Sequence, residues 1–218
     1  MKIIKYEIKH CNAGWRDFSF LKIMTDEGIS GISEYNECYG SPGLSIIIRR
    51  FMDKILDHDP ICHEKIHQFL YASSRQAPGG IAQQAIAAIE NALLDIKGKY
   101  LNVPVHTLLG GAIRDKLPLY WSHCGTYRIS EELSKIMQKP QVKTLEDLKQ
   151  LGKDVKDAGY KGLKTNIFTF AETPILEMQG FAGKPGWPEL NVDKHIINGL
   201  VKQIDALRSG AGEDMGIH

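Results

Sequence analysis

The first part of the chain alternates apolar and polar residues, as half-buried strands do. Residues 1–10 and 18–25 show this alternation, and Asp26-Glu27-Gly28 is a turn signal before it resumes over residues 29–34. The loops between these stretches are short, so the pattern predicts an antiparallel meander of three strands. A polar loop with glycines follows at residues 35–43.

After this loop the spacing of apolar residues becomes helical. The helical stretches are residues 44–56, residues 59–73 with Pro60 in the first turn, and residues 81–100. The last is alanine-rich and places its large apolar residues on one stripe. A meander followed by helices predicts an α+β domain.

A different order of elements begins after Arg114-Asp115-Lys116, which we interpret as a domain boundary. Residues 117–122 predict a strand. Thr144 starts a helix with a Thr-x-x-Asp cap pattern, and this helix ends at Gly159 before a short apolar strand. Residues 168–192 predict a long irregular loop, and residues 193–208 a further helix that Ser209-Gly210-Ala211-Gly212 breaks. The β-α-β-α order predicts the opening of a parallel α/β array.

Composition excludes several classes of function. The chain is 43% hydrophobic and 24% charged, with a formal net charge of +1, so charge gives no reason to expect nucleic acid or an anionic membrane as partner. No apolar run is long enough for a membrane span, and the N-terminus lacks the apolar core of a signal peptide. The four cysteines form no CxxC pair, which indicates free thiols in a reducing cytoplasm.

Lys164 is the first residue with candidate chemistry. It lies near the carboxyl end of the strand that follows Gly159, and ligands of parallel α/β folds sit at this end of the sheet. By position alone, Lys164 is either a solvated residue at the loop edge or a desolvated base.

The stretch His63-Glu64-Lys65-Ile66-His67 fits H-E-x-x-H, which on a helix places two imidazoles on one face for zinc. Glu90 on the next helix is a possible third ligand. Lys65 argues against a zinc hydrolase, because it puts a positive charge inside the motif. The simpler interpretation is a solvated helix face. Cys124, just after a strand, is a weaker candidate for a nucleophile, since no activating partner can be named.

Three segments together carry a resemblance to a known family. They are Ala88-Ile89-Glu90-Asn91-Ala92-Leu93-Leu94-Asp95-Ile96-Lys97-Gly98-Lys99, then Val103-Pro104-Val105-His106-Thr107-Leu108-Leu109-Gly110-Gly111, and Arg114-Asp115-Lys116-Leu117-Pro118-Leu119-Tyr120. With the meander and helices before them, they resemble the mandelate racemase and muconate lactonizing branch of the enolase superfamily. The resemblance implies an α+β capping domain at residues 1–116. It implies the start of a (β/α)-barrel at residues 117–218.

The resemblance also implies chemistry. Such enzymes use Mg²⁺ to stabilise the enediolate formed when the proton α to a carboxylate is removed. A Lys-x-Lys motif at the second barrel strand commonly supplies one base, and here it is Lys164-Thr165-Asn166. Lys164 is then expected to orient or neutralise the carboxylate. Asn166 replaces the usual base and can only form hydrogen bonds, so the base is expected on a later strand.

The resemblance further implies that the substrate is covered by two capping loops. The first, residues 10–17, offers Trp15, and the second, residues 35–43, offers Tyr39. His123, just past the first barrel strand, is expected to face the barrel mouth. These three residues are the expected substrate-binding contacts.

We therefore expect magnesium-dependent dehydration of a sugar acid or related hydroxy acid. A racemase or cycloisomerase of the same superfamily is the alternative. A zinc hydrolase and a non-catalytic fragment are alternatives of other classes. The Mg²⁺ ligands are expected beyond His218, since the residues after Lys116 are far fewer than the roughly 250 of a (β/α)₈ barrel. The expected partners are the remainder of the barrel and further copies in a homo-oligomer, and the chain alone is expected to be inactive.

Overall fold

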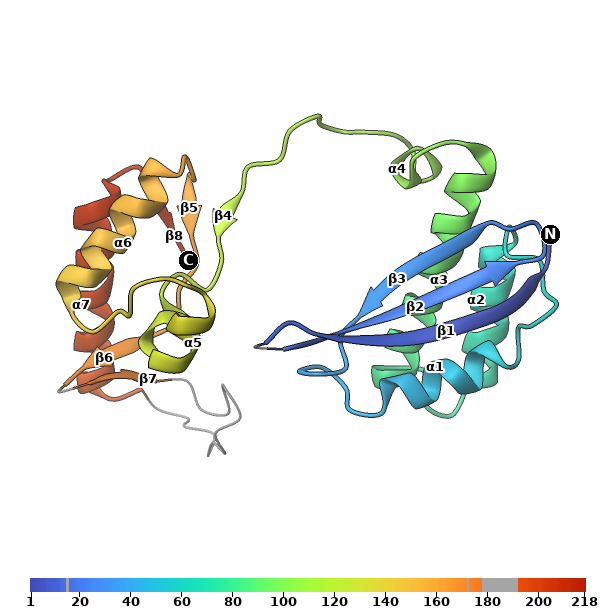
Figure 1. Cartoon of the computed structure of the whole chain (residues 1–218), viewed down its shortest axis with the longest axis horizontal. Coiled ribbons are helices and arrows are strands. Elements are labelled where there is room, and N and C mark those ends of the chain that lie inside the picture. The colour runs from blue at the N-terminus through green and yellow to red at the C-terminus, as the bar shows by residue number, and fades with distance from the viewer. Residues whose placement is uncertain (15, 172, 178–191) are drawn as a thin grey trace. The chain divides into compact units, whose positions relative to one another are not determined.

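A three-stranded antiparallel sheet opens the chain in the computed structural model, which describes residues 1–14, 16–171, 173–177 and 192–218. Its strands are β1 (Ile3–Asn12), β2 (Asp17–Thr25) and β3 (Ser30–Tyr35), in that order (Figure 1). Leu21 and Ile23 are fully buried on one face of β2. The predicted meander is confirmed.

Helices cover the apolar face of this sheet in the first of two units, Met1–Asp115 (Figure 1). They are α1 (Leu44–Met52), α2 (His63–Ser73), α3 (Gly80–Leu101) and the short α4 (Val105–Leu108). The predicted stripe of α3 is confirmed, because Ile86, Ile89, Leu93 and Ile96 are fully buried. The prediction that α2 starts at Pro60 is wrong. The Asp59 carboxylate accepts a hydrogen bond from the Ile61 N–H at 3.0 Å and turns the chain before the helix begins.

The second unit, Lys116–His218, is built on three short parallel strands. They are β4 (Tyr120–Trp121), β5 (Gly162–Leu163) and β8 (Gly216–Ile217), with β5 in the middle. The helices α6 (Leu145–Asp157) and α7 (Lys194–Ala211) pack against one another and share a core with the strands. Thr144 caps α6 through a capping box with Asp147, as the sequence predicts.

Two predictions for this unit are wrong. The stretch expected to be an irregular loop contains a hairpin, β6 (Phe168–Phe170) paired with β7 (Pro174–Leu176). The helix α7 does not break at Ser209-Gly210 but continues to Ala211. A Cβ at Gly210 would lie 1.8 Å from the Lys149 carbonyl oxygen, so this glycine lets α7 approach α6 closely. The sequence also gave no sign of the 3₁₀ helix η1 (Thr126–Ile129) or of α5 (Glu131–Ile136).

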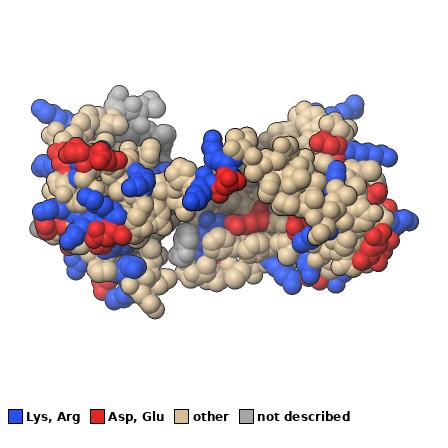
Figure 2. Space-filling model, turned by 90° about the horizontal axis from the view of Figure 1, so that it is seen from above, with Lys and Arg blue, Asp and Glu red and all other residues tan. Residues whose placement is uncertain are grey.

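Surface features agree with the composition. On the face seen in Figure 2, Lys and Arg side chains are interspersed with Asp and Glu over each unit, without a broad area of one sign. Among the described helices, none is long and apolar enough to cross a membrane. The cysteines are all free thiols, with Cys124 buried and Cys11, Cys38 and Cys62 exposed.

Gly31 tests how closely the sheet packs on α3. A Cβ there would lie 2.0 Å from the Ala92 carbonyl oxygen and 2.8 Å from Ile96 Cγ1. We expect Gly31→Ala to lower the free energy of unfolding by roughly 1–3 kcal/mol or more, because backbone must shift to relieve the overlap. Gly79→Ala is the matched control, since nothing lies within 4 Å of its Cβ position. Denaturant unfolding of both variants measures the difference, and equal stabilities would contradict this packing.

Candidate functional site

Lys164 immediately follows β5 and makes two main-chain hydrogen bonds to one neighbouring segment, the end of β4 and the residues after it. Its N–H donates to the Trp121 carbonyl at 2.8 Å, and its carbonyl accepts from the Cys124 N–H at 2.7 Å. Leu163 points into the core shared with α6 and α7, and side chains alternate along a strand. Lys164 therefore lies on the face of the sheet opposite these helices, where it is exposed.

His123 adopts a strained conformation beside this strand end. Trp121 bonds the N–H of Lys164 and Cys124 bonds its carbonyl. Two residues, Ser122 and His123, lie between these partners, where a regular parallel ladder has one. His123 has φ 49°, a left-handed conformation that is uncommon for residues other than glycine. The extra residue turns the ring so that Nδ1 lies 3.3 Å from Asn166 Oδ1. The ring also tilts against Tyr127 at a centroid distance of 5.3 Å.

Asn166 is anchored from η1 as well. The hydroxyl of Thr126, a buried residue at the start of η1, donates to Asn166 Oδ1 at 2.7 Å. The structure thus brings together two of the predicted site residues, His123 and Asn166. Thr126 was not predicted from the sequence, because nothing marks a lone threonine after a glycine as a partner for a residue 40 positions away.

Gln203 of α7 fixes the main chain that carries Asn166. Its Nε2 donates to the Asn166 carbonyl at 2.7 Å and to Thr165 Oγ1 at 3.1 Å, and its Oε1 accepts from the Phe168 N–H at 3.0 Å. The side chain is fully buried. Sequence analysis missed Gln203. The available signal was a glutamine on the inward stripe of an amphipathic helix, where a buried amide needs partners.

The strand ends do not offer a magnesium site by themselves. Residues 121–126, 163–168 and 217–218, which follow or end β4, β5 and β8, include neither Asp nor Glu. Mg²⁺ is bound in proteins chiefly through carboxylate oxygens. Glu177, which lies nearby in sequence, accepts a hydrogen bond from the Thr169 hydroxyl within the hairpin. The described residues that follow β4 and β5 thus supply an ammonium, an amide and an imidazole, but no carboxylate.

The two predicted capping loops contact one another in the first unit. The Arg16 guanidinium carbon lies 4.1 Å from the centre of the Phe18 ring and 5.9 Å from that of Tyr39. Tyr39 is 60% exposed. Trp15 lies outside the described residues. Arg16 was missed because the sequence gives no sign that it reaches the second loop.

An open hollow lies beside these loops. The Glu37 carboxylate at its base accepts a hydrogen bond from the Gly43 N–H at 2.9 Å and another from the Ser45 hydroxyl. His10 Nδ1 lies 3.0 Å from Ser19 Oγ on the facing strands. Most of the residues that line the hollow have polar side chains. The lining residues are His10, Asp17, Ser19, Glu37, Cys38, Pro42, Gly43 and Ser45.

Cys124 is not a competent nucleophile. It is fully buried, and desolvation raises the pKa of its thiol to about 12, although the charge of Arg128 acts in the opposite direction. The thiolate is the nucleophilic form of cysteine, so a thiol that keeps its proton at neutral pH does not attack a substrate.

The H-E-x-x-H stretch lies at the start of α2, but its two imidazoles have different partners. His67 Nδ1 lies 3.0 Å from Glu90 Oε2 on α3, and His63 Nε2 lies 3.6 Å from Glu64 Oε1. A zinc hydrolase needs both imidazoles on the metal and the glutamate as base. The described side chains are not arranged in this way. Glu64 and Glu90 are the residues whose ligand atoms lie near His63, and His67 contacts Glu90.

The chain is similar in sequence to a known enzyme family and to named enzymes. Residues 9–110 match the family model described as mandelate racemase / muconate lactonizing enzyme, N-terminal domain. A D-galactonate dehydratase of Pectobacterium atrosepticum is 38% identical over 142 residues, which are 65% of this chain and 36% of the relative.

Solved structures match the whole chain. A proposed L-alanine-DL-glutamate epimerase of Burkholderia xenovorans LB400 shows 39% identity and a TM-score of 0.92, covering 100% of this chain and 55% of that one. A second structure with that name, bound to magnesium and fumarate, shows 40% identity and a TM-score of 0.91, covering 99% of this chain and 53% of that one. The chain thus spans about half the length of these structures.

Gln203 gives a test of the strand-end geometry. We expect Gln203→Met to lower the free energy of unfolding by about 1–3 kcal/mol, because the buried Phe168 N–H loses its acceptor. Lys202→Met, at an exposed position on the same helix, should change it by no more than about 0.5 kcal/mol. Chemical denaturation measures both, and a Gln203→Met variant as stable as the control would show that the network is dispensable.

Cys124 gives a second test. Iodoacetamide at pH 8 should modify the exposed Cys11, Cys38 and Cys62 and spare Cys124 in the native protein, whereas denatured protein should react at every cysteine. Because burial raises the pKa of this thiol to about 12 from an ordinary value of 9.0, its contribution to stability is complete below pH 9 and is lost as pH rises toward 12. Mass spectrometry of peptides reads the labelling. Modification of native Cys124 at the rate of the exposed thiols would contradict its burial.

Proposed function

Because residues 9–110 match the N-terminal domain model of the mandelate racemase and muconate lactonizing enzyme family, we propose that this chain forms the capping domain and first barrel strands of an acid-sugar dehydratase. The proposal rests on one observation above all: Lys164 and an anchored Asn166 stand together at the carboxyl end of β5. The match to a D-galactonate dehydratase supports a sugar acid as substrate.

The proposed reaction removes two groups from a 2,3-dihydroxy acid. A base takes the proton at C2. The hydroxyl at C3 takes up a proton, which the protonated base can supply, and leaves as water, so that an enol forms and tautomerises to a 2-keto-3-deoxy acid. When bound, Mg²⁺ would stabilise the negative charge on the carboxylate as the C2 proton leaves. A relative of this chain has been solved with magnesium. We propose that the ligands of the metal belong to later strands, because the described strand ends carry no carboxylate.

In this scheme Lys164 holds the substrate carboxylate. Lys164 is exposed on the sheet face opposite the helices, while its main chain is hydrogen-bonded to Trp121 of β4 and to Cys124 after this strand. A cation fixed at this position attracts the carboxylate and offsets the negative charge that accumulates there as C2 loses its proton.

Asn166 and His123 act as hydrogen-bonding groups for the substrate hydroxyls. The amide of Asn166 cannot accept a proton at neutral pH, so Asn166 positions the substrate and does not serve as base. Thr126 and His123 fix its orientation. In this arrangement the groups at the end of β5 stabilise charge and do not take up the C2 proton.

That limit favours dehydration over epimerisation. Epimerisation requires an acid and a base on opposite faces of C2, whereas loss of water needs a single base on one face. Replacement of the second lysine of the family motif by Asn166 removes one of the two proton carriers. The relatives described as epimerases keep the racemase as the alternative, and its signature is exchange of the C2 proton without loss of water.

The capping domain would then select the substrate. We propose that Tyr39 and Arg16 of the capping loops contact the substrate, and that Glu37 binds a hydroxyl of it. The position of the Arg16 guanidinium over the Tyr39 ring and the hydrogen bonds that hold the partly buried Glu37 support these roles. These roles, the homo-oligomer and the cytoplasmic location are predictions.

The test uses the complete enzyme that contains this chain, with D-galactonate and related sugar acids in D₂O and proton NMR as readout. We expect Lys164→Met to lower kcat roughly 10²–10⁴-fold, because a charged group that acts in the transition state is lost. Lys161→Met, an exposed lysine at the start of the same strand, is the control and should retain activity.

The outcomes separate the two candidate reactions. Release of a 2-keto-3-deoxy acid supports the dehydratase. Deuterium incorporation at C2 with no keto acid would identify a racemase or epimerase instead. An unchanged rate in Lys164→Met would remove Lys164 from the mechanism.

A further inference from the structure

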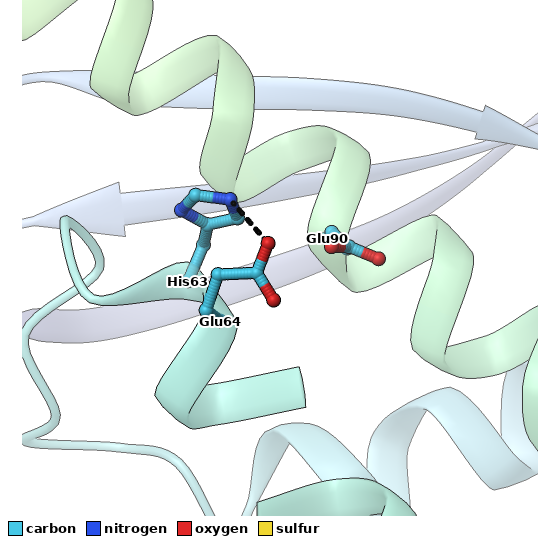
Figure 3. Close-up of side chains that lie close together, drawn as sticks. All are labelled: His63, Glu64 and Glu90. Carbon is cyan, nitrogen blue, oxygen red and sulfur yellow. Dashed lines mark ion pairs between the residues drawn. The ribbon is translucent and has the colours of Figure 1, made fainter. Parts of the chain in front are cut away.

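A cluster of metal-binding side chains lies on the capping domain and has no part in the proposed reaction. His63 and Glu64 begin α2, and Glu90 lies on the neighbouring turn of α3 (Figure 3). One ligand atom from each of the three residues lies within 4.8 Å of the others. The buried Ile66 and Leu70 pack α2 into the core with α3, so the two helices hold these side chains at their shared edge.

The side chains are partly removed from water. The exposed fraction of the side chain is 14% for His63 and 26% for Glu90, whereas it is 76% for Glu64. Figure 3 shows the Glu64 carboxylate between the His63 ring and Glu90. The ligand set thus has two partly buried members and one exposed member, which can approach an ion from the solvent side.

His67 supports the cluster from outside. Its Nδ1 lies 3.0 Å from Glu90 Oε2, so it can donate a hydrogen bond to the carboxylate and fix its orientation. Hydrogen-bonded partners of this kind orient the ligands of metal sites and raise their affinity. The spacing of four residues between His63 and His67 places both imidazoles on the α3 side of α2.

Lys97 is the competing cation. Its Nζ lies 3.4 Å from His63 Nδ1, and Lys97 is about two turns of α3 beyond Glu90 in the direction of the C-terminus. An ammonium donates to Nδ1 only when this nitrogen carries no proton. A metal at Nε2 requires the neutral ring with its proton on Nδ1. Binding of a metal therefore displaces the Lys97 contact, and Lys97 lowers the affinity of the site.

We propose that His63, Glu64 and Glu90 bind one divalent transition-metal ion, of the Zn²⁺, Co²⁺ or Ni²⁺ type, that links α2 to α3. One imidazole and two carboxylates suit these ions, and the two negative charges balance the ion. The imidazole makes the set less suitable for Mg²⁺, which prefers oxygen ligands. The site is independent of the dehydratase reaction, so it stands or falls separately from the proposed function.

The experiment is calorimetric titration of the purified 218-residue chain with ZnCl₂ and CoCl₂, together with the visible absorption of bound Co²⁺. We expect one site whose affinity falls at least about 10-fold in both His63→Ala and Glu90→Gln, and by a smaller factor in His67→Gln. Lys97→Met should raise the affinity. Binding of Zn²⁺ should raise the unfolding temperature of the wild-type chain, because the ion joins two helices.

His195→Ala is the matched control, since it removes an exposed imidazole from the second unit. Its affinity should equal that of the wild-type chain. Circular dichroism checks that each variant is folded. If His63→Ala does not fold, Glu90→Gln still tests the site, because it keeps the size of the side chain. The proposal is overturned if Zn²⁺ and Co²⁺ do not bind, if Glu90→Gln binds as tightly as wild type, or if His195→Ala abolishes binding.

Discussion

The strand end that carries the candidate site depends on the buried amide of Gln203. An amide without partners is costly inside a core, and this one finds three on the main chain and side chains between Thr165 and Phe168. The same contacts fix the chain just after β5 from the helix side. Lys164 and Asn166 are then held at the surface by groups that are themselves buried. A solvent-exposed site gains defined geometry in this way without a rigid loop of its own.

Features that depend on local sequence could be predicted well. The meander follows from alternation, the long helix α3 from its apolar stripe, and the start of α6 from the Thr144 capping box. The position of Lys164 at the end of a short strand follows from the helix and glycine before it. These signals depend on a few neighbouring residues, so they can be recognised in the sequence without knowledge of the rest of the fold.

Features that depend on contacts across the fold could not be predicted. Gly210 looks like a helix breaker, yet it lies inside α7 because α6 leaves no room for a Cβ. Thr126 and Gln203 reach Asn166 from elements that are distant in sequence. Arg16 near Tyr39 joins two loops in the same way. The identity of the candidate site residues was thus accessible from the sequence, but the groups that hold them in place were not.

The surroundings of Asn166 explain why an amide is suited to this position. Thr126 donates its hydroxyl proton to Oδ1, and the His123 ring approaches the same oxygen. An ammonium there would have no oxygen to offer, so both partners would have to become acceptors. The replacement of the family lysine is therefore matched by its neighbours and is not an isolated change. A hydrogen-bond acceptor at this strand end is consistent with the proposed chemistry, in which only one face of the substrate exchanges protons.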